Sequence, residues 1–299
     1  MRIITKICFL LLIGTIVFSC KKEEKVQVHK DLIFEDNKAP DYSGVTTLQV
    51  ENYVNRLYID LIGNAPTSTE LSNDVAFLEA NSLSQASRDT VVSKLIAKKQ
   101  LYAKLWQDAS NLMTNGGSKA YFYLEILTYQ YVASLYYQNG DTLNAQFIDY
   151  EVQKLTDLYQ ADSLLMLGQI SHNEFHKRFC FNLIYDEINM GTENFVVACF
   201  ENLLGRYPTV QELASGKSMV DGTSTILFLQ NGDSKIDFLN ILTASREYYE
   251  SRVDDAYNIL LQRKPTSVEM GNETNTFVLD NSLENVYKKI CKTDEYAAF

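Results

Sequence analysis

Three side chains near the middle of the chain have the types and the spacing of a metal site. His172, His176 and Cys180 recur every four residues, so a helix would place all three on one face. Two histidines four residues apart can share a zinc ion, and a thiolate one turn further on could supply a third ligand. A metal-dependent enzyme or a redox accessory protein is therefore one interpretation. In the competing interpretation the histidines cap the helix or lie on the protein surface, and Cys180 packs in the core.

Other catalytic motifs are incomplete in this sequence. Glu174 is not placed as in the His-Glu-x-x-His motif of metalloproteases. Residues 215–218 (SGKS) imitate the end of a phosphate-binding loop, but Gln211 stands where the first glycine is required. No nucleophile elbow accompanies the helical histidines. The sequence therefore favours a non-enzymatic function without a cofactor.

The amino-acid composition excludes some fold classes and some classes of partner. The 299 residues include 38 acidic and 27 basic side chains, giving a net charge of −11. A chain this acidic lacks the basic patch that phosphate contacts need, so we expect no nucleic-acid partner. Only 4 prolines and 13 glycines favour long helices over a turn-rich β-sandwich. We predict an all-α fold, and only around Thr225–Leu229 does the pattern also allow a short strand.

One motif recurs three times and takes up three of the four prolines. In each copy an aromatic residue and aliphatic residues precede a turn, Pro-Thr, a glutamate and another aliphatic residue. The copies are 58–71 (YIDLIGNAPTSTEL), 200–213 (FENLLGRYPTVQEL) and 257–270 (YNILLQRKPTSVEM). Proline prevents the first helix from continuing, and Thr-x-x-Glu is a capping box that begins the next one. The predicted caps, with their glutamates, are Thr67 and Glu70, Thr209 and Glu212, and Thr266 and Glu269.

The turn before each Pro-Thr contains the residue that closes the preceding helix. Gly63 and Gly205 suit the left-handed position that closes a helix, whereas Gln262 breaks this rule, so strain or a different closure is expected there. A second landmark follows the later corners as 245–248 (SREY) and 293–296 (TDEY), each resembling a helix start. The motif therefore predicts an array of helix–turn–helix repeats.

These features divide the chain into six expected segments. They are a signal peptide (1–19), a flexible tether (20–47), a first helical repeat (48–115), a tyrosine-rich helical insert (116–192), a second repeat (193–253) and a third repeat (254–299). Turn signals divide the insert into three predicted helices. Its tyrosines lie on more than one helix face, which favours a contact surface, since tyrosine is enriched at interfaces. Core packing and carbohydrate binding are the alternatives. The tyrosines are Tyr121, Tyr123, Tyr129, Tyr131, Tyr136, Tyr137, Tyr150 and Tyr159.

The N-terminus has the features of an export signal. Arg2 and Lys6 precede a mostly apolar run over 7–18, which is too short to span a bilayer but has the length of a signal-peptide core. The small residue before Cys20 resembles a bacterial lipoprotein box, which implies acylation of this cysteine and a membrane anchor. By the same resemblance Lys21, in place of aspartate, points to the outer membrane. The charged run that it begins is similar to the tether of Bacteroidetes lipoproteins at the cell surface, although a periplasmic orientation is also open.

The repeats carry a second resemblance. Residues 55–67 (NRLYIDLIGNAPT), continuing to Tyr102 and Trp106, resemble an exported helical domain of unknown function that is abundant in planctomycetes. The LLGR-x-PT type copies at 203–209 and 260–266 are similar to short helical repeats of surface and extracellular bacterial proteins. Neither family implies an activity. Our leading hypothesis is therefore a lipid-anchored, non-enzymatic protein that binds or scaffolds a protein partner at the outer membrane.

Overall fold

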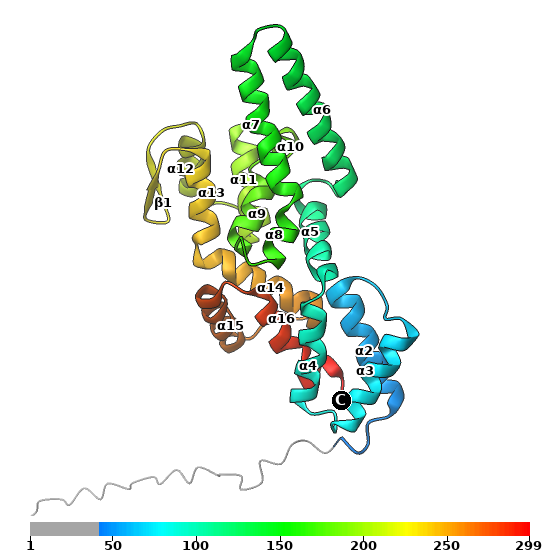
Figure 1. The fold of residues 1–299 in the computed structure, drawn as a ribbon. Helices are drawn as coiled ribbons and strands as arrows, with labels where there is room; N and C mark the ends of the chain where they lie inside the picture. Colours follow the sequence, from blue (N-terminus) through cyan, green and yellow to red (C-terminus); the bar gives the residue numbers. More distant parts are fainter. Residues whose placement is uncertain (1–41) are drawn as a thin grey trace, which may run out of the picture. The chain divides into compact units, whose positions relative to one another are not determined.

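The computed structural model describes residues 42–299. Within this range sixteen helices and one two-stranded sheet form the fold (Figure 1), which confirms the predicted all-α class. The helices are α2 (Thr47–Ile62), α3 (Ser68–Ala80), α4 (Gln85–Ile96), α5 (Lys99–Met113), α6 (Lys119–Gln138), α7 (Thr142–Tyr159), α8 (Ala161–Met166), α9 (His172–Cys180), α10 (Leu183–Ile188), α11 (Thr192–Leu204), α12 (Val210–Val220), α13 (Lys235–Ala244), α14 (Arg246–Leu261), α15 (Ser267–Asp280), α16 (Leu283–Cys291) and α17 (Asp294–Ala297). The strands β1 (Thr225–Leu227) and β2 (Gln230–Gly232) pair antiparallel. The first lies where the sequence allowed a short strand, and the second was not expected.

Each repeated motif forms the corner between two helices. The helix before the corner ends at a residue in the left-handed region, which is Gly63 (φ 76°), Gly205 (φ 69°) or Gln262 (φ 55°). Glycine adopts this conformation freely, whereas a residue with a Cβ adopts it at a cost. The third corner therefore keeps the geometry of the other two and carries the expected strain.

The helix after each corner begins with a complete capping box. The threonine hydroxyl accepts the backbone N–H of the glutamate three residues on, and that carboxylate accepts the threonine N–H. The N-caps are Thr67 for α3, Thr209 for α12 and Thr266 for α15. Two backbone donors that the helix itself cannot satisfy are thereby paired in each repeat.

Helix α14 belongs to two repeats. It runs without a break from Arg246 to Leu261, so the expected boundary between 193–253 and 254–299 falls inside it. Its first turn carries the SREY landmark of the second repeat, and its last turn leads into the third corner. The second and third repeats are therefore continuous.

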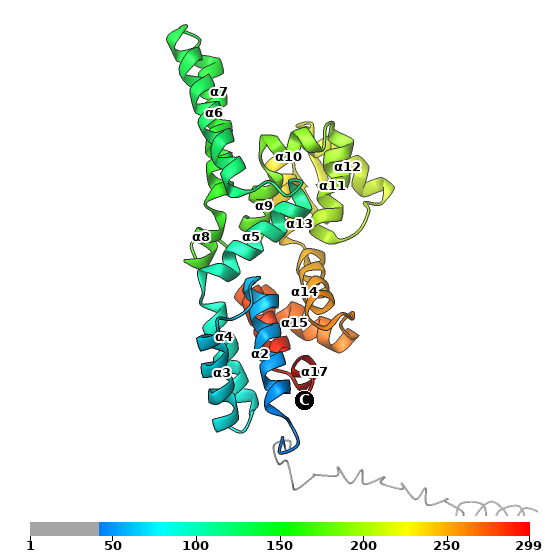
Figure 2. The same ribbon diagram turned by 90° about the vertical axis from the view of Figure 1, so that its right-hand side faces the viewer.

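The first and last helices of the described range lie side by side (Figure 2). The Tyr53 hydroxyl of α2 donates to the carbonyl oxygen of Cys291 at 3.1 Å. Arg56 donates from Nη1 to the carbonyl oxygen of Tyr296 at 2.9 Å, and its guanidinium lies 4.1 Å from the centre of that ring. The first and third repeats therefore share a core.

The insert contains five helices, so the prediction of three helices is wrong. The two long helices α6 and α7 are followed by the short helices α8, α9 and α10. Asn182 causes the break between α9 and α10. Its amide donates to the carbonyl oxygens of Arg178 (3.0 Å) and Phe179 (2.8 Å), and its side-chain oxygen accepts the backbone N–H of Tyr185 (3.0 Å). One buried side chain thus closes one helix and begins the next.

Trp106 joins the first repeat to the insert. Its side chain on α5 is buried, and Nε1 donates to the carbonyl oxygen of Leu158 at 2.8 Å. The indole meets the ring of Phe122 on α6 edge to face and the ring of Phe179 on α9 at a tilt, with centroids 5.5 Å apart in both cases. This residue therefore contacts three helices of the insert at once.

Candidate functional site

His172 and His176 lie on one face of α9, but His172 is committed to a partner. Its Nε2 is 3.0 Å from a carboxylate oxygen of Glu284 on α16. A carboxylate can only accept here, so Nε2 carries the proton and has no lone pair for a metal. His172 therefore connects the insert to the third repeat.

His176 is held as a neutral side chain. Its Nδ1 lies 3.0 Å from the carbonyl oxygen of His172 and 2.8 Å from the Tyr248 hydroxyl. Because the carbonyl can only accept, this contact places the proton on Nδ1 and leaves Nε2 as an acceptor. Burial, together with the positive charge of Arg252, holds the pKa of His176 well below its ordinary value.

Cys180 does not join the two histidines. Its sulfur is buried 3.9 Å from the sulfur of Met113, and the thiols of Cys180, Cys199 and Cys291 are all free and buried. Within residues 42–299 no group of three or more His, Cys, Asp or Glu side chains is placed to hold a metal ion. The alternative of a metal site at His172, His176 and Cys180 therefore has no support from the geometry.

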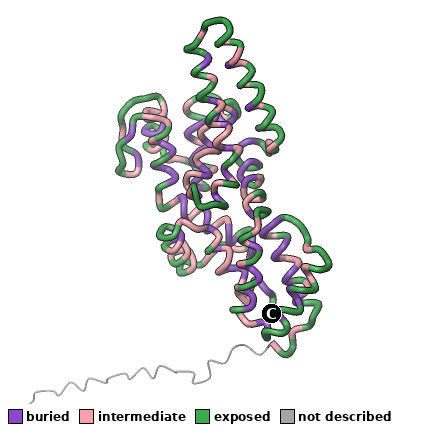
Figure 3. Tube along the Cα trace, viewed as in Figure 1, coloured by how far each residue is buried: buried purple, intermediate pink, exposed green. Residues whose placement is uncertain are grey.

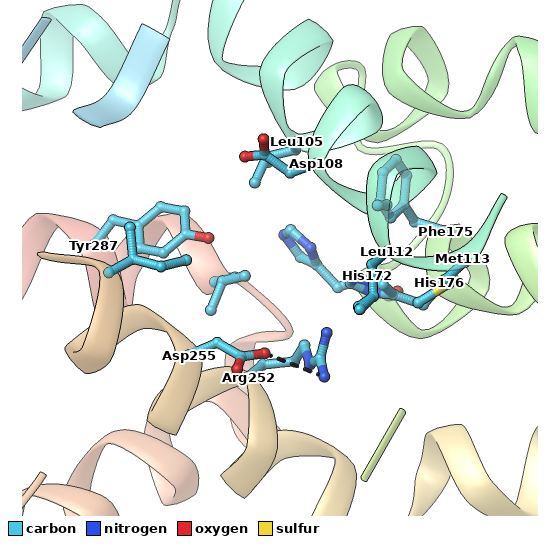
Figure 4. Close-up of a pocket in the computed structure, with 13 residues that line it drawn as sticks. Leu105, Asp108, Leu112, Met113, His172, Phe175, His176, Arg252, Asp255 and Tyr287 are labelled. Carbon is cyan, nitrogen blue, oxygen red and sulfur yellow. Dashed lines mark hydrogen bonds and ion pairs between the residues drawn. The ribbon is translucent and has the colours of Figure 1, made fainter. Parts of the chain in front are cut away.

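Both histidines instead line a pocket at the meeting of α5, α9, α14 and α16 (Figure 4). The cavity has a volume of about 250 Å³. Most of its wall is apolar, and a few ionisable groups converge on it. The apolar wall is Leu105, Ala109, Leu112, Met113, Phe175, Ile259 and Leu283, and the polar residues are Asp108, His172, His176, Arg252, Asp255 and Tyr287.

Arg252 of α14 is the least expected residue of this pocket. Its side chain is only 8% exposed. Its Nη2 donates to the carbonyl oxygen of Asn202 and to the Ser251 hydroxyl, each at 3.0 Å, and lies 3.2 Å from an oxygen of Asp255. Its Nε is buried without a hydrogen-bond partner among the described residues. A buried donor without an acceptor is costly and marks a place where a ligand oxygen would be favourable.

Two carboxylates stand at the rim. The side chains of Asp108 and Asp255 are 48% and 50% exposed, and Figure 4 shows them on different sides of the pocket. Partial burial raises the pKa of Asp255. The positive charge of Arg252 acts in the opposite direction but offsets only part of this increase. Burial and the neighbouring carboxylates also raise the pKa of Tyr287, so its hydroxyl stays neutral.

A second candidate site is the hairpin formed by α6 and α7. Both views show the ends of these helices extending past the rest of the described chain (Figures 1 and 2), and exposed residues dominate on them (Figure 3). We call their exposed apolar side chains the α6–α7 surface. It consists of Tyr121, Tyr123, Leu124, Leu127, Tyr131, Leu135, Tyr137, Leu143, Phe147 and Tyr150.

Helix α6 is apolar on two opposite faces. Phe122, Ile126 and Ala133 are buried and form one stripe at helical spacing. Leu124 and Tyr131, seven residues apart, lie on the opposite face and are exposed. A helix with apolar residues all round is usually covered on every side. None of the eight tyrosines that the sequence singles out is fully buried.

In the second and third corners an arginine forms ion pairs with two glutamates, which the sequence analysis did not predict. Arg206 binds both carboxylate oxygens of Glu212 at 2.8 and 2.9 Å, and its Nε donates to Glu247 at 2.6 Å. In the third repeat Arg263 binds Glu269 and Glu295 in the same way. The available signal was an arginine three residues before the threonine in both copies. These groups brace the corner to the SREY and TDEY helices, so we assign them a structural role.

We expect the capping box to be visible as energetic coupling. Thr209→Ala should lower the free energy of unfolding by about 0.5–2 kcal/mol, because a backbone donor loses its acceptor. Since Thr209 and Glu212 cap each other, Thr209→Ala combined with Glu212→Ala should cost less than the sum of the single changes. Denaturant unfolding of the four proteins measures this difference. If the losses of the two single variants simply added up in the double variant, the capping box would not form. The control is Thr209→Ala combined with Val210→Ala, whose exposed side chain has no part in the box, so these two losses should add.

The acid range offers a further check on Glu212. The hydrogen bonds from Arg206 lower its pKa from 4.5 to about 2. A carboxyl group whose folded-state pKa is depressed stabilises the fold fully above the unfolded pKa, and this contribution disappears as the pH falls through the folded pKa. The loss in free energy of unfolding caused by Glu212→Ala should therefore have its full value above about pH 5 and become smaller toward pH 2. Denaturant unfolding of the wild type and the variant over this pH range measures the difference.

The lipidation candidate, Cys20, lies outside the described residues, together with the predicted signal and most of the tether. Within residues 42–299 the structure has no helix of the length and hydropathy that crossing a bilayer requires.

Comparison of the chain with known protein families, characterised proteins and solved structures found no match.

Proposed function

We propose that this chain is a non-enzymatic, lipid-anchored binding or scaffold protein of the outer membrane. Its Cys20 would carry the anchor and its repeats would present the α6–α7 surface to a protein partner, on the cell surface or on the periplasmic face. The observation that carries the binding role is the exposed apolar face of α6, opposite the face that packs in the hairpin.

The composition of this surface favours a protein over a sugar. Leu124, Leu127 and Leu135 lie among the tyrosines and are exposed. Aliphatic side chains cannot satisfy the hydroxyl groups of a carbohydrate, whereas they complement the apolar centre of a protein interface. Lys119 and Glu125 are the only charged residues of α6. Tyrosine enrichment and charge depletion are both typical of interface cores.

Polar substitution of the surface should remove the partner without unfolding the protein. We expect Leu124→Gln with Tyr131→Gln to reduce, at least tenfold, the amount of partner protein that co-purifies with the full-length chain from membranes. Both side chains are exposed, so stability should change by no more than about 0.5 kcal/mol. Quantitative mass spectrometry of the purified complexes measures the loss.

The matched control is Val268→Gln with Leu279→Gln. These side chains are also apolar and exposed, but they lie on α15. The proposal expects the control to retain the partner. Equal recovery of the same proteins with the wild type and with the α6 variant would contradict it.

A further inference from the structure

The pocket between α5, α9, α14 and α16 contains polar groups that a scaffold does not need. It shares no residue with the α6–α7 surface, so it stands apart from the proposed function. We propose that this pocket binds a small apolar amino acid as the zwitterion, with the carboxylate at Arg252, the ammonium group at the neighbouring rim carboxylate of Asp255 and the side chain against the apolar wall.

Arg252 supplies the anion-binding end. The hydrogen bonds that the described residues accept from its guanidinium all involve Nη2, and Nε is buried without a partner. A ligand carboxylate would give the free donors charge-assisted hydrogen bonds. The neutral His176 beside it carries no second positive charge that would favour a phosphate or a dianion.

Asp255 supplies the cation-binding end, because it lies beside Arg252, whereas Asp108 lies on another side of the pocket. Asp108 forms an ion pair with Lys104 at 2.6 Å, and Asp255 forms one with Arg252 at 3.2 Å. Each pair uses one carboxylate oxygen, so each carboxylate retains a free oxygen. The half-exposed position of Asp255 lets an ammonium group bind at the rim while it keeps part of its hydration. Figure 4 shows the neutral Tyr287 hydroxyl directed toward the middle of the pocket, where it can donate or accept.

The volume and the apolar wall of the cavity indicate the size of the ligand and the kind of side chain it carries. About 250 Å³ lies just below the range of about 300–1,000 Å³ for drug-sized ligands, which suits a single amino acid. Leu105, Met113 and Phe175 offer an aliphatic and aromatic surface for its side chain. A free inorganic anion would face two carboxylates, and a simple organic cation would face Arg252. Only a molecule with both charges and an apolar body satisfies all three parts of the wall.

Three related molecules test the assignment on the purified full-length chain. Leucine carries both charges, leucinamide lacks the carboxylate and 4-methylpentanoate lacks the ammonium group. Titration calorimetry should detect leucine binding, with each analogue at least about tenfold weaker, because each leaves one set of charged groups unpaired. Absence of leucine and phenylalanine binding up to about 10 mM would overturn the proposal. An analogue that binds as tightly as leucine would overturn the zwitterion assignment.

Two variants locate the site. Arg252→Met should abolish leucine binding, but Arg252 also holds the Asn202 carbonyl, so this variant can lose stability. Leu112→Trp avoids that difficulty, because Leu112 is 54% exposed at the rim and a larger ring there would obstruct the pocket. We expect at least a tenfold loss of affinity at an unchanged melting temperature. The control is Leu279→Trp, which adds the same ring outside the pocket and should bind leucine normally. Undiminished binding by folded Leu112→Trp would place the ligand elsewhere and contradict the inference.

Discussion

Trp106→Ala should lower the free energy of unfolding by about 3–5 kcal/mol, the largest loss that we expect from a single substitution. The indole is 1% exposed and contacts the rings of Phe122 and Phe179. Its removal leaves a cavity where three helices of the insert meet the first repeat. It also leaves the buried carbonyl of Leu158 without its donor, which adds a desolvation cost.

Circular dichroism during denaturant unfolding is the suitable measurement, because Trp106 is the only tryptophan of the chain and its fluorescence disappears with it. Trp106→Phe separates the two contributions, since it retains much of the ring volume but loses the N–H donor. The exposed Phe147→Ala is the matched aromatic control and should change stability by no more than about 0.5 kcal/mol. A loss below about 1 kcal/mol for Trp106→Ala would show that this contact does not hold the insert in place.

Cys20→Ala should move the protein from the membrane fraction to the soluble fraction. In bacterial lipoproteins the cysteine at this position is acylated, and each buried CH₂ of an acyl chain contributes about 0.8 kcal/mol to membrane binding. Two or more chains therefore hold a protein stably, and their loss changes partitioning by orders of magnitude. Fractionation of cells followed by intact-mass analysis of the protein measures both the location and the lipid.

The matched control is Cys8→Ala. Cys8 lies within the predicted signal peptide, so its replacement should leave both the lipid and the membrane association unchanged. Washing in about 1 M salt removes proteins that are held only by charge, because the screening length then falls to about 3 Å. If Cys20→Ala stayed in the membrane fraction after this wash, the lipid anchor would be contradicted.

The corners could be predicted from the sequence because their determinants are local. Gly205 closes one helix, Pro208 follows in the turn, and Thr209 and Glu212 begin the next helix, all within eight residues. The rules of helix capping act at this distance and need no knowledge of the rest of the fold. Gln262 shows the limit of such rules, because the third corner keeps its left-handed closure without a glycine.

The missed features depend on residues that are distant in the sequence or on one unusual side chain. The pocket combines Asp108, His176 and Arg252 from three helices whose packing no periodicity reveals. The spacing of the histidines correctly placed them on one helix face. It could not show that Glu284, from the third repeat, forms a hydrogen bond with His172. Likewise, the helix break at Asn182 depends on one buried amide that serves both helix ends.

Site-specific photo-crosslinking in cells can show whether a protein partner binds the α6–α7 surface. A photoreactive phenylalanine analogue would replace Tyr131 on α6 in one strain and Val268 on α15 in another, since both positions are exposed. We expect one discrete adduct with another protein from position 131 and none from position 268. No adduct at 131, the same adduct at both positions, or an adduct only with a second copy of this chain would contradict it.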